Sequence, residues 1–459
     1  MADDETNLVR SKGEEDIPAQ YGSTTTQQPS IEEFDEKELN EIYEEIGFGP
    51  AQYLYWTLVG LVSYSDFAEL TLMAVLLPML RCEWGLSSAF ETAIVLSMFA
   101  SYAIFAMLFG RVADAYGRKS VLQWSILSLL LAAVGGALSP NKWVFFVTRL
   151  VTGACVGINL SCIACYSTEF AESKYRAYGI LNFAISSSLG IAAVSGEAYL
   201  LISLIGWRWL IIIVSLPAVP ALILLLVLPE SPRYLCVSGQ QERAMQAVRF
   251  MAKLNGKTLK ENVRMICYER EDLGSYPILL NQKNKKSTIG LSFMYFNNIF
   301  VDYGFLVLIP LLLSSNYCGT ATAPVHKCQP LTKDNLLELT VAGSAAVFGA
   351  IAAFIFAQVS GRLKPLRVSS AILVVAVASL FICINHIVIF VTVTTIKFFD
   401  TFANVIIWIM MPESFPTNIR STAIGFINGW GKIGGVFGTG SVYLLFYISP
   451  HLLFGLFFL

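Results

Sequence analysis

Residues 110–120 read GRVADAYGRKS, a loop rich in glycine and charge that separates two long apolar runs. Parts of this loop, and of the loop that follows the apolar run at 143–167, recur at a constant offset of 244 residues. The matching pairs are Gly117 and Gly361, Arg118 and Arg362, Glu169 and Glu413, and Arg176 and Arg420. One offset shared by four positions indicates an internal repeat. We therefore expect two halves of the chain that fold alike.

The composition is typical of a chain built for lipid, with 55% hydrophobic and only 14% charged residues. Long, nearly uncharged runs recur, and each can cross a bilayer as a helix of about 20 residues. Barrel strands would give short alternating segments, which the sequence lacks. We predict an all-α polytopic membrane protein of two six-helix halves, twelve helices in all. Spans are expected near 54–80, 91–110, 120–139, 143–167, 177–204, 208–229, 288–313, 337–359, 368–386, 387–411 and 422–447. A twelfth span is expected to begin just before Leu459 and to be incomplete.

The distribution of charged residues divides the chain into four segments. The first 50 residues hold 14 acidic against three basic side chains, so we expect residues 1–52 to form an acidic, disordered tail. We expect an N-terminal half at 53–229, a linker at 230–287 with 11 Lys and Arg residues, and a C-terminal half at 288–459. Because basic loops stay in the cytoplasm, the tail and the linker are predicted to be cytoplasmic. A repeat in one orientation also predicts a site between the halves near the membrane midplane.

These motifs resemble the major facilitator superfamily, whose signature loop between helices 2 and 3 is similar to GRVADAYGRKS. RLVTGACVG and PESPRYL resemble its sugar-porter and organic-ion branch. IGFGPAQY, YSDFAEL, LRCEWGL, GWRWL, FNNIFVDYG and PESFPTNIR resemble the synaptic vesicle 2-related group within it. The resemblance covers about residues 38–459 and implies a multi-pass transporter of a vesicle or plasma membrane. The second signature loop departs from the pattern, because Gln358 stands where the first has Asp114.

Several charges lie inside the apolar runs, and an ionised side chain there is costly unless it meets a partner or a cavity. Asp66 and Glu69 are three residues apart and share one helix face. We expect that face to meet a central aqueous cavity; the alternative is a fixed ion pair, with Arg149 or Lys397 as counter-charge. Lys397 could instead pair with Asp400, three residues away. The candidates for a substrate or proton site are Asp66, Glu69, Arg149, Asp302, Lys397, Asn428 and Lys432.

Polar and aromatic side chains in the spans are candidates for a cavity lining, although any one such residue more often serves ordinary helix packing. They are Tyr64, Asn298, Tyr303, Asn404, Trp408 and Asn428. Glu197 and Glu338 lie nearer to span ends, where we expect them to be solvated.

The charged loops resemble the superfamily's conformational latch, in which ion pairs form in one access state and break in the other. Topology anchoring by positive charge is the simpler alternative. The candidate latch residues are Gly110, Asp114, Gly117, Arg118, Lys119, Glu169, Arg176, Glu230, Arg233, Arg362, Glu413 and Arg420.

The remaining motifs give less information about function. Cys318 and Cys328 lie in a polar loop that is predicted to face the lumen or outside, where a disulfide is favoured. Gly429, Gly431 and Gly434 match GxGxxG, but they lie in an apolar helix without a preceding strand and indicate close helix contact instead. No ATP-binding loop, metal-ligand spacing or nucleophile motif occurs in the sequence. We therefore expect no enzymatic activity, no cofactor, no metal and no nucleic-acid partner.

Two functions remain open on the sequence. One is a secondary transporter of a small organic solute, not identified by the sequence, that is driven by a proton or cation and works by alternating access. The other is a transporter-like vesicle membrane protein that acts as a receptor, scaffold or regulator by binding partners, through its acidic cytosolic tail or its lumenal loop. The expected partners are this solute and the lipid bilayer that surrounds the helices.

Overall fold

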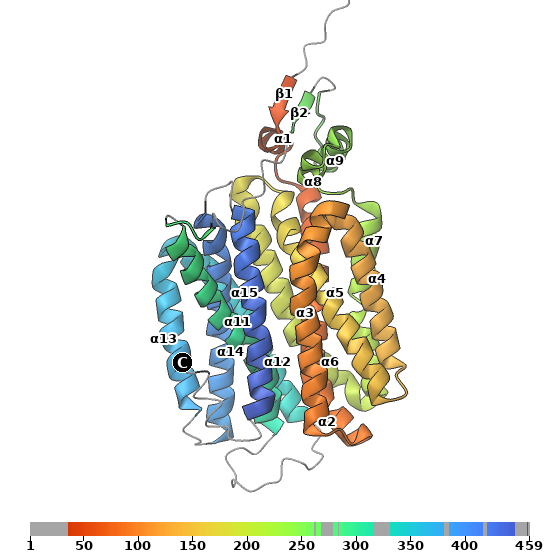
Figure 1. Ribbon diagram of the computed structural model, residues 1–459, viewed down its shortest axis with the longest axis vertical. Coiled ribbons are helices and arrows are strands. Elements are labelled where there is room, and N and C mark those ends of the chain that lie inside the picture. Colours follow the sequence, from red (N-terminus) through yellow and green to blue (C-terminus); the bar gives the residue numbers. More distant parts are fainter. Residues whose placement is uncertain are drawn as a thin grey trace, which may run out of the picture.

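The computed structural model describes residues 35–260, 263–267, 279–282, 284–314, 331–380, 385–415, 420–445 and 457. Most of this part is helical, and the long helices run side by side as a bundle (Figure 1). Those of the N-terminal half are α2 (Pro50–Trp84), α3 (Ser88–Tyr116), α4 (Arg118–Ala137), α5 (Lys142–Glu169), α6 (Arg176–Ser215) and α7 (Ala218–Val227). Those of the C-terminal half are α11 (Lys285–Ser314), α12 (Lys333–Val359), α13 (Leu363–Ser379), α14 (His386–Glu413) and α15 (Arg420–Leu445). They follow the expected spans closely.

Local sequence sets where the helices begin and bend. Ser87, Asn141, Thr332 and Asn385 cap α3, α5, α12 and α14 by accepting a hydrogen bond from a backbone N–H of the first turn. The long helix α6 is two helices joined at Gly206, whose φ of 77° breaks the helical path. It therefore contains the fifth expected span and the start of the sixth, which continues in α7. Within the described residues, eight helical segments are long and apolar enough to cross a membrane.

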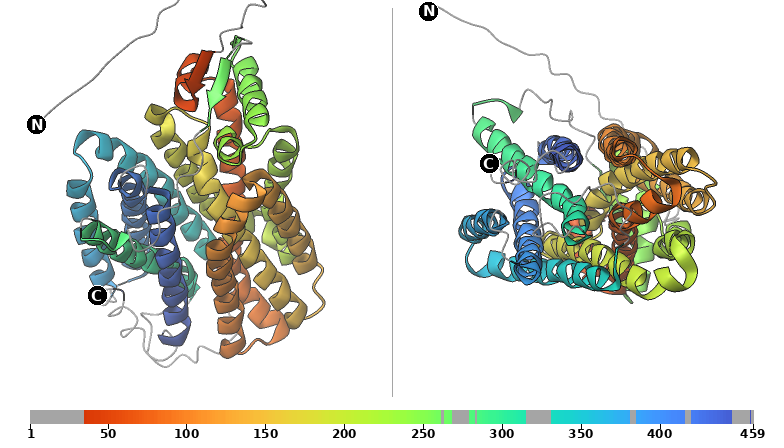
Figure 2. Two further views of the ribbon diagram at one scale, coloured as in Figure 1. Left: turned by 45° about the horizontal axis from the view of Figure 1, so that its top comes forward. Right: turned by 90° about the horizontal axis from the view of Figure 1, so that it is seen from below.

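The helix pairs repeat between the halves. In the N-terminal half α2 packs along α6, α3 along α5 and α4 along α5. In the C-terminal half α11 packs along α15, α12 along α14 and α13 along α14, which are the corresponding pairs. The two groups meet where α6 packs on α12 and α3 packs on α15. Seen along the bundle, they form two clusters side by side (Figure 2).

Glycines permit the closest helix contacts. A Cβ atom on Gly434 would lie 2.5 Å from the carbonyl oxygen of Phe296, and one on Gly431 would lie 2.4 Å from the ring of Tyr295. Only a residue without a side chain lets α15 approach α11 this closely. The GxGxxG pattern in α15 is thus a packing feature, as expected from its apolar surroundings.

A small unit outside the membrane helices joins the start of the chain to the linker. Strand β1 (Asp35–Glu38) pairs in parallel with β2 (Val263–Ile266), with Asp35 opposite Val263. Helices α1 (Leu39–Ile46), α8 (Pro232–Val237) and α9 (Gln241–Leu254) complete it. We call this group the tail–linker unit; it lies at one end of the bundle (Figure 1).

The disorder expected for residues 1–52 is wrong from residue 35 onward. Helix α1 is amphipathic, and its Ile42 and Ile46 are buried against Val248 and other apolar residues of the linker. A partner far along the chain thus orders a segment whose own composition favours disorder. Residues 1–34 lie outside the described part.

The described part of the chain contains disulfide bonding that was not predicted from the sequence. Cys236 of α8 is bonded to Cys267, directly after β2, and this bond ties the latch helix α8 to the strand pair. Cys82 is also disulfide-bonded. Cys155 and Cys162 are buried. The expected pair of Cys318 and Cys328 lies outside the described residues, so it stays a prediction.

Candidate functional site

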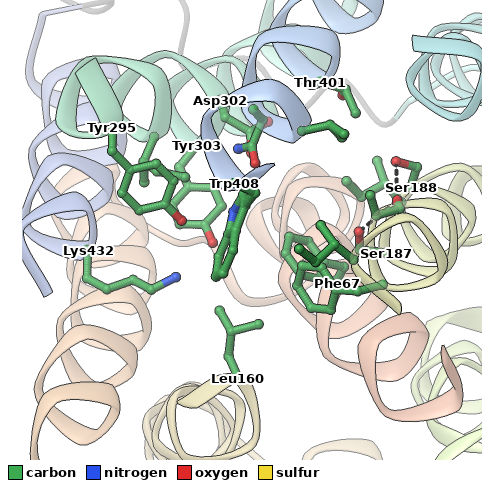
Figure 3. Close-up of a pocket in the computed structure, with 17 residues that line it drawn as sticks. Phe67, Leu160, Ser187, Ser188, Tyr295, Asp302, Tyr303, Thr401, Trp408 and Lys432 are labelled. Carbon is green, nitrogen blue, oxygen red and sulfur yellow. Dashed lines mark hydrogen bonds between the residues drawn. The ribbon is translucent and has the colours of Figure 1, made fainter. Parts of the chain in front are cut away.

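A cavity of about 50 Å³ lies between the two halves (Figure 3). The N-terminal half lines it with Phe67 of α2, Leu160 of α5 and a stripe of α6 that includes Phe183, Ser187 and Ser188. The C-terminal half contributes residues of α11, α14 and α15: Tyr295, Ile299, Asp302, Tyr303, Thr401, Asn404, Val405, Trp408 and Lys432. This volume holds a few water molecules. A larger solute needs the halves to move apart.

A polar contact crosses from one half to the other beside this cavity. The hydroxyl of Tyr102 on α3 lies 2.9 Å from that of Tyr303 on α11, and both tyrosines are buried. The Lys432 ammonium donates a hydrogen bond to the same Tyr102 hydroxyl and lies 4.6 Å from the centre of the Tyr102 ring. Any movement of the halves at α3 and α15 must rearrange this contact.

A second polar cluster joins α11 to α14 within the C-terminal half. Lys397 Nζ lies 3.1 Å from Asp302 Oδ1, so Lys397 pairs with Asp302 and not with its own-helix neighbour Asp400. Asp400 is buried and accepts a hydrogen bond of 3.1 Å from Asn298 Nδ2. Of these residues only Asp302 lines the cavity.

Asp66 and Glu69 lie on the face of α2 that contacts α5. Both have no exposed surface, and neither lines the cavity. The Arg149 guanidinium donates a hydrogen bond of 3.0 Å to Glu69, and Asn159 Nδ2 lies 2.9 Å from Asp66 Oδ1. The expectation that these acids face a central aqueous cavity is wrong for this structure, whereas Arg149 is confirmed as a counter-charge. Their role in transport stays a prediction.

The two halves thus place acid–base pairs between corresponding helices. In one half an acid of its first helix, α2, meets a base of its fourth, α5; in the other, an acid of α11 meets a base of α14. The pairs Glu69–Arg149 and Asp302–Lys397 differ in their access to the cavity, since only the second reaches it through Asp302. The helix pairing is repeated between the halves, whereas the two ion pairs do not occupy equivalent positions.

The latch residues of the N-terminal half converge at the end of the bundle that carries the tail–linker unit. Arg118 forms an ion pair with Glu169. The carboxylate of Glu230 accepts hydrogen bonds of 2.9 Å from the backbone N–H groups of Lys119 and Ser231. Burial raises the pKa of Glu230 above its ordinary value, although these donors and Arg118 oppose the rise.

Contacts from the tail–linker unit reinforce this group. The Tyr43 hydroxyl of α1 donates a hydrogen bond of 3.0 Å to the carbonyl oxygen of Glu169, and Arg233 donates one of 2.8 Å to the side chain of Asn40. The start of the chain is therefore attached to the same residues that the sequence assigns to the latch.

The C-terminal half repeats the first latch pair. Arg362 and Glu413 form two parallel bonds, of 2.8 Å and 3.1 Å, and each residue lies 244 positions after its counterpart in the Arg118–Glu169 pair. Gly117 and Gly361 also share a left-handed backbone, with φ of 96° and 77°. Arg176 begins α6 and Gly110 lies in α3. The side chains of Asp114 and Arg420 are outside the described part.

The cavity lining was only partly foreseen. Tyr303, Asn404, Trp408, Asp302 and Lys432 line it as expected. Tyr64 bonds to Glu197 at 3.3 Å instead, Asn298 bonds to Asp400, and Asn428 does not reach the cavity. Neither Glu197 nor Glu338 is fully solvated, because Glu338 pairs with His386 at 3.4 Å and Glu197 is partly buried.

Sequence reasoning missed Tyr102 and the small and aromatic residues of α6. The missed lining residues include Phe67, Phe183, Ser187, Ser188, Tyr295 and Thr401. Hydroxyls and rings at helical spacing carry no signal that separates a cavity wall from ordinary packing. In the described part of the chain, no cluster of three His, Cys, Asp or Glu side chains could hold a metal.

Known proteins resemble this chain in sequence and in fold. The sequence model of the Major Facilitator Superfamily matches residues 58–439. The Synaptic vesicle 2-related proteins of Xenopus laevis and Rattus norvegicus are 29% and 27% identical over 406 residues, which is 86% of this chain and 73% of each relative. The partially occluded inward open structure of the xylose transporter XylE from E. coli has a TM-score of 0.67 at 16% identity, and covers 89% of this chain and 95% of its own.

The match to the family model spans most of the chain, and the relatives align with 86% of it. The fold agrees, because the solved transporter superimposes on the paired halves described above. The chain is a multi-pass membrane protein that belongs to the major facilitator superfamily, in its synaptic vesicle 2-related group.

Proposed function

We propose that the protein is a secondary transporter that moves a small polar or charged organic solute by alternating access, coupled to a proton or cation. The observation that carries this proposal is the cavity between the halves, lined by α2, α5 and α6 on one side and by α11, α14 and α15 on the other. A site shared by two rigid halves is exposed to one face or the other as the halves rock.

The latch supplies the second part of the proposal. Arg118–Glu169 and Arg362–Glu413 lie at the same end of the bundle. Glu230, between α7 and α8, accepts a hydrogen bond from Lys119, next to the turn at Gly117. Ion pairs of this kind hold one arrangement and are released in the other, which gives two discrete states. We expect this end to face the cytoplasm, because it carries the basic linker.

Asp66 is our candidate for the coupling proton. Its carboxyl group has no exposed surface and no ion-pair partner among the described residues, and its Oδ2 atom makes no hydrogen bond. An isolated buried carboxylate is costly, so the proton-bearing form suits this position. Glu69 differs, because Arg149 compensates its charge.

The test uses proteoliposomes on a solid-supported membrane, with charge movement recorded as sugars, organic cations and organic anions are applied between pH 5 and 8. The proposal expects a solute-dependent current that depends on pH and is reduced in the Asp66→Asn, Glu69→Gln double variant. A folded wild-type protein that gives no current with any solute would contradict it.

A partner-binding role is the second candidate, and the tail–linker unit favours it. This unit gives the start of the chain a folded surface outside the membrane helices. If this role is the main one, deletion of residues 1–46, which removes β1 and α1 of this unit, abolishes partner capture, while the double variant of Asp66 and Glu69 leaves it unchanged.

A further inference from the structure

The cavity contains one cation that lacks a carboxylate. Lys432 lines the cavity and is 5% exposed, and its ammonium points into the space between Trp408 and Leu160 (Figure 3). Within the described part of the chain no acidic side chain lies within 4 Å of it. The other charged lining residue, Asp302, is already paired with Lys397. Lys432 is therefore a cation of the lining that has no ion-pair contact among the described residues.

Tyr102 compensates this charge only in part. An ammonium has three donors, and the described contacts of Lys432 are the bond to the Tyr102 hydroxyl and the face of the same ring. A buried cation without an opposite charge is unfavourable in a region that excludes water. A ligand that brings a carboxylate to Lys432 would complete the pair.

The rest of the lining suits a flat apolar body. Phe67 lies 6.2 Å from Phe183, Phe183 lies 6.0 Å from Trp408, and Trp408 lies 6.0 Å from Tyr295, measured between ring centres. These four rings form a continuous wall of the cavity. Aromatic walls bind planar ligands through stacked or edge contacts and leave orientation to a few polar groups.

The hydroxyl groups on the opposite wall are unsuited to an anion. Ser187 and Ser188 both donate their hydrogens to the carbonyl oxygen of Ala184, at 3.0 Å and 2.8 Å, so they offer lone pairs to the cavity. Lys432 is thus the strong donor of the lining. The acids that suggested a cationic solute, Asp66 and Glu69, lie outside the cavity.

We propose that the cavity binds an organic monoanion, a carboxylate on a planar aromatic body, with the carboxylate at Lys432 and the ring against Phe183 and Trp408. This assignment names the solute class and rests on the transport function proposed above. The sequence left the class open between sugars, cations and anions.

The test compares three probes of one ring size and three charges: benzoate, benzamide and benzylamine. Binding to the purified full chain is measured by calorimetry and by the shift in melting temperature. We expect benzoate to bind at least tenfold more tightly than benzamide, and benzylamine to bind least. In Lys432→Gln the preference of benzoate over benzamide should fall below twofold, while Lys432→Arg retains most of it. Lys333→Gln, an exposed lysine at the start of α12, is the matched control and should leave the preference unchanged.

Lys432→Met is a second neutral variant, used in case Lys432→Gln fails to fold. Both neutral variants should raise the melting temperature of the unliganded protein, because each removes a buried charge. Benzoate binding that is unaffected in a folded Lys432→Gln, tighter binding of benzylamine, or no binding of any probe would each overturn the proposal. Currents evoked by sugars or cations alone would overturn the anion assignment and leave the transport function standing. Benzoate binding that depends on Lys432 but is accompanied by no current would support the anion assignment and contradict the transport function.

Discussion

Glu69 and Arg149 form an ion pair in which neither side chain has any exposed surface. Removing one partner of a buried pair leaves the other charge uncompensated, which costs about 3 to 5 kcal/mol in proteins. We expect Glu69→Gln and Arg149→Gln to destabilise the protein by this amount and the double variant to recover part of the loss. Melting of the detergent-solubilised protein, followed by size-exclusion chromatography, measures the effect.

Arg208→Gln is the matched control for this pair. Arg208 pairs with Glu83 at 3.2 Å, but both side chains are about half exposed. An exposed pair contributes 1 kcal/mol or less, roughly, because water and salt screen it. Equal destabilisation by Arg208→Gln and Glu69→Gln would contradict the buried-pair assignment.

Asp66 should respond differently from Glu69. The amide of Asp66→Asn can still accept the hydrogen bond from Asn159, and it replaces a carboxyl that the proposal treats as proton-bearing. We expect little change in melting temperature, together with loss of the pH dependence of transport between pH 5 and 8. A pH dependence equal to that of the wild type would remove Asp66 from the coupling mechanism.

At this scale the sequence predicted that charges lie in the membrane, but not where they point. The spacing of Asp66 and Glu69 shows that they share a face. Whether the face meets the cavity or α5 depends on a partner 80 positions away, Arg149, in the folded chain. Tyr102 gave no signal at all, because a tyrosine in an apolar run is ordinary.

The turn between α3 and α4 has a matched counterpart in the other half, which allows a controlled prediction for Gly117→Ala. Gly117 has φ 96° and ψ 141°, a region that other residues enter at a cost of about 1 to 3 kcal/mol. A Cβ there would also lie 2.8 Å from Glu230 Oε2 and displace the carboxylate. Gly361, with φ 77°, has no described residue other than its chain neighbours within 4 Å of its Cβ position.

We therefore expect Gly117→Ala to lower the melting temperature more than Gly361→Ala, since only the first pushes on Glu230. Thermal unfolding of both variants in one detergent measures the difference. If the two variants lose stability equally, the contact between Glu230 and the turn contributes nothing.

Glu230 gives a pH-dependent prediction at the level of the helix ends. Because burial raises the pKa of its carboxyl in the folded protein, the folded state holds this proton more tightly than the unfolded state. Stability from this group therefore rises as pH falls through the folded pKa toward the ordinary value of 4.5, and is lost as pH increases. The melting temperature of the wild type, minus that of Glu230→Gln, should be larger at pH 5 than at pH 7.5. A difference that is constant or falls on acidification would contradict the assignment.

The positions of the long helices were predicted better from the sequence than the contacts of single residues, for physical reasons. Apolar runs of this length have few alternatives to helices in lipid, and the 244-residue offset of Arg118 and Glu169 anticipated the pair Arg362–Glu413. The pairing of β1 with β2 was not foreseen, because four polar residues at Asp35–Glu38 carry no strand pattern and their partner lies over 200 positions away. The bond between Cys236 and Cys267 depends on the same fold.

The whole molecule is held in its present arrangement by contacts between the halves. α6 packs on α12, α3 packs on α15, and the hydroxyls of Tyr102 and Tyr303 meet beside the cavity. With room for only a few water molecules, the cavity cannot admit an organic solute until these contacts change. The internal repeat predicted that a site lies between the halves. Most of the residues that line the cavity could not be predicted, because they depend on helix packing that the sequence does not reveal.

The central claim is that the cavity opens to each face of the membrane in turn, and accessibility of Ser187→Cys tests it without knowledge of the solute. Ser187 lines the cavity. A Cβ on Gly196 would lie 3.5 Å from Thr340 Cγ2, so cysteines at these two positions can form a disulfide that locks α6 to α12 at the end remote from the tail–linker unit. The wild type, treated in the same way with oxidant and reductant, accounts for the native cysteines.

The measurement is the rate at which a membrane-impermeant thiosulfonate modifies Ser187→Cys in oriented vesicles, applied from each face. We predict modification from both faces in the unlocked protein. In the oxidised Gly196→Cys, Thr340→Cys background, we predict modification only from the face that carries the tail–linker unit, with access from the other face restored on reduction. Modification from a single face in the unlocked protein, or rates that the lock leaves unchanged, would contradict alternating access through this cavity.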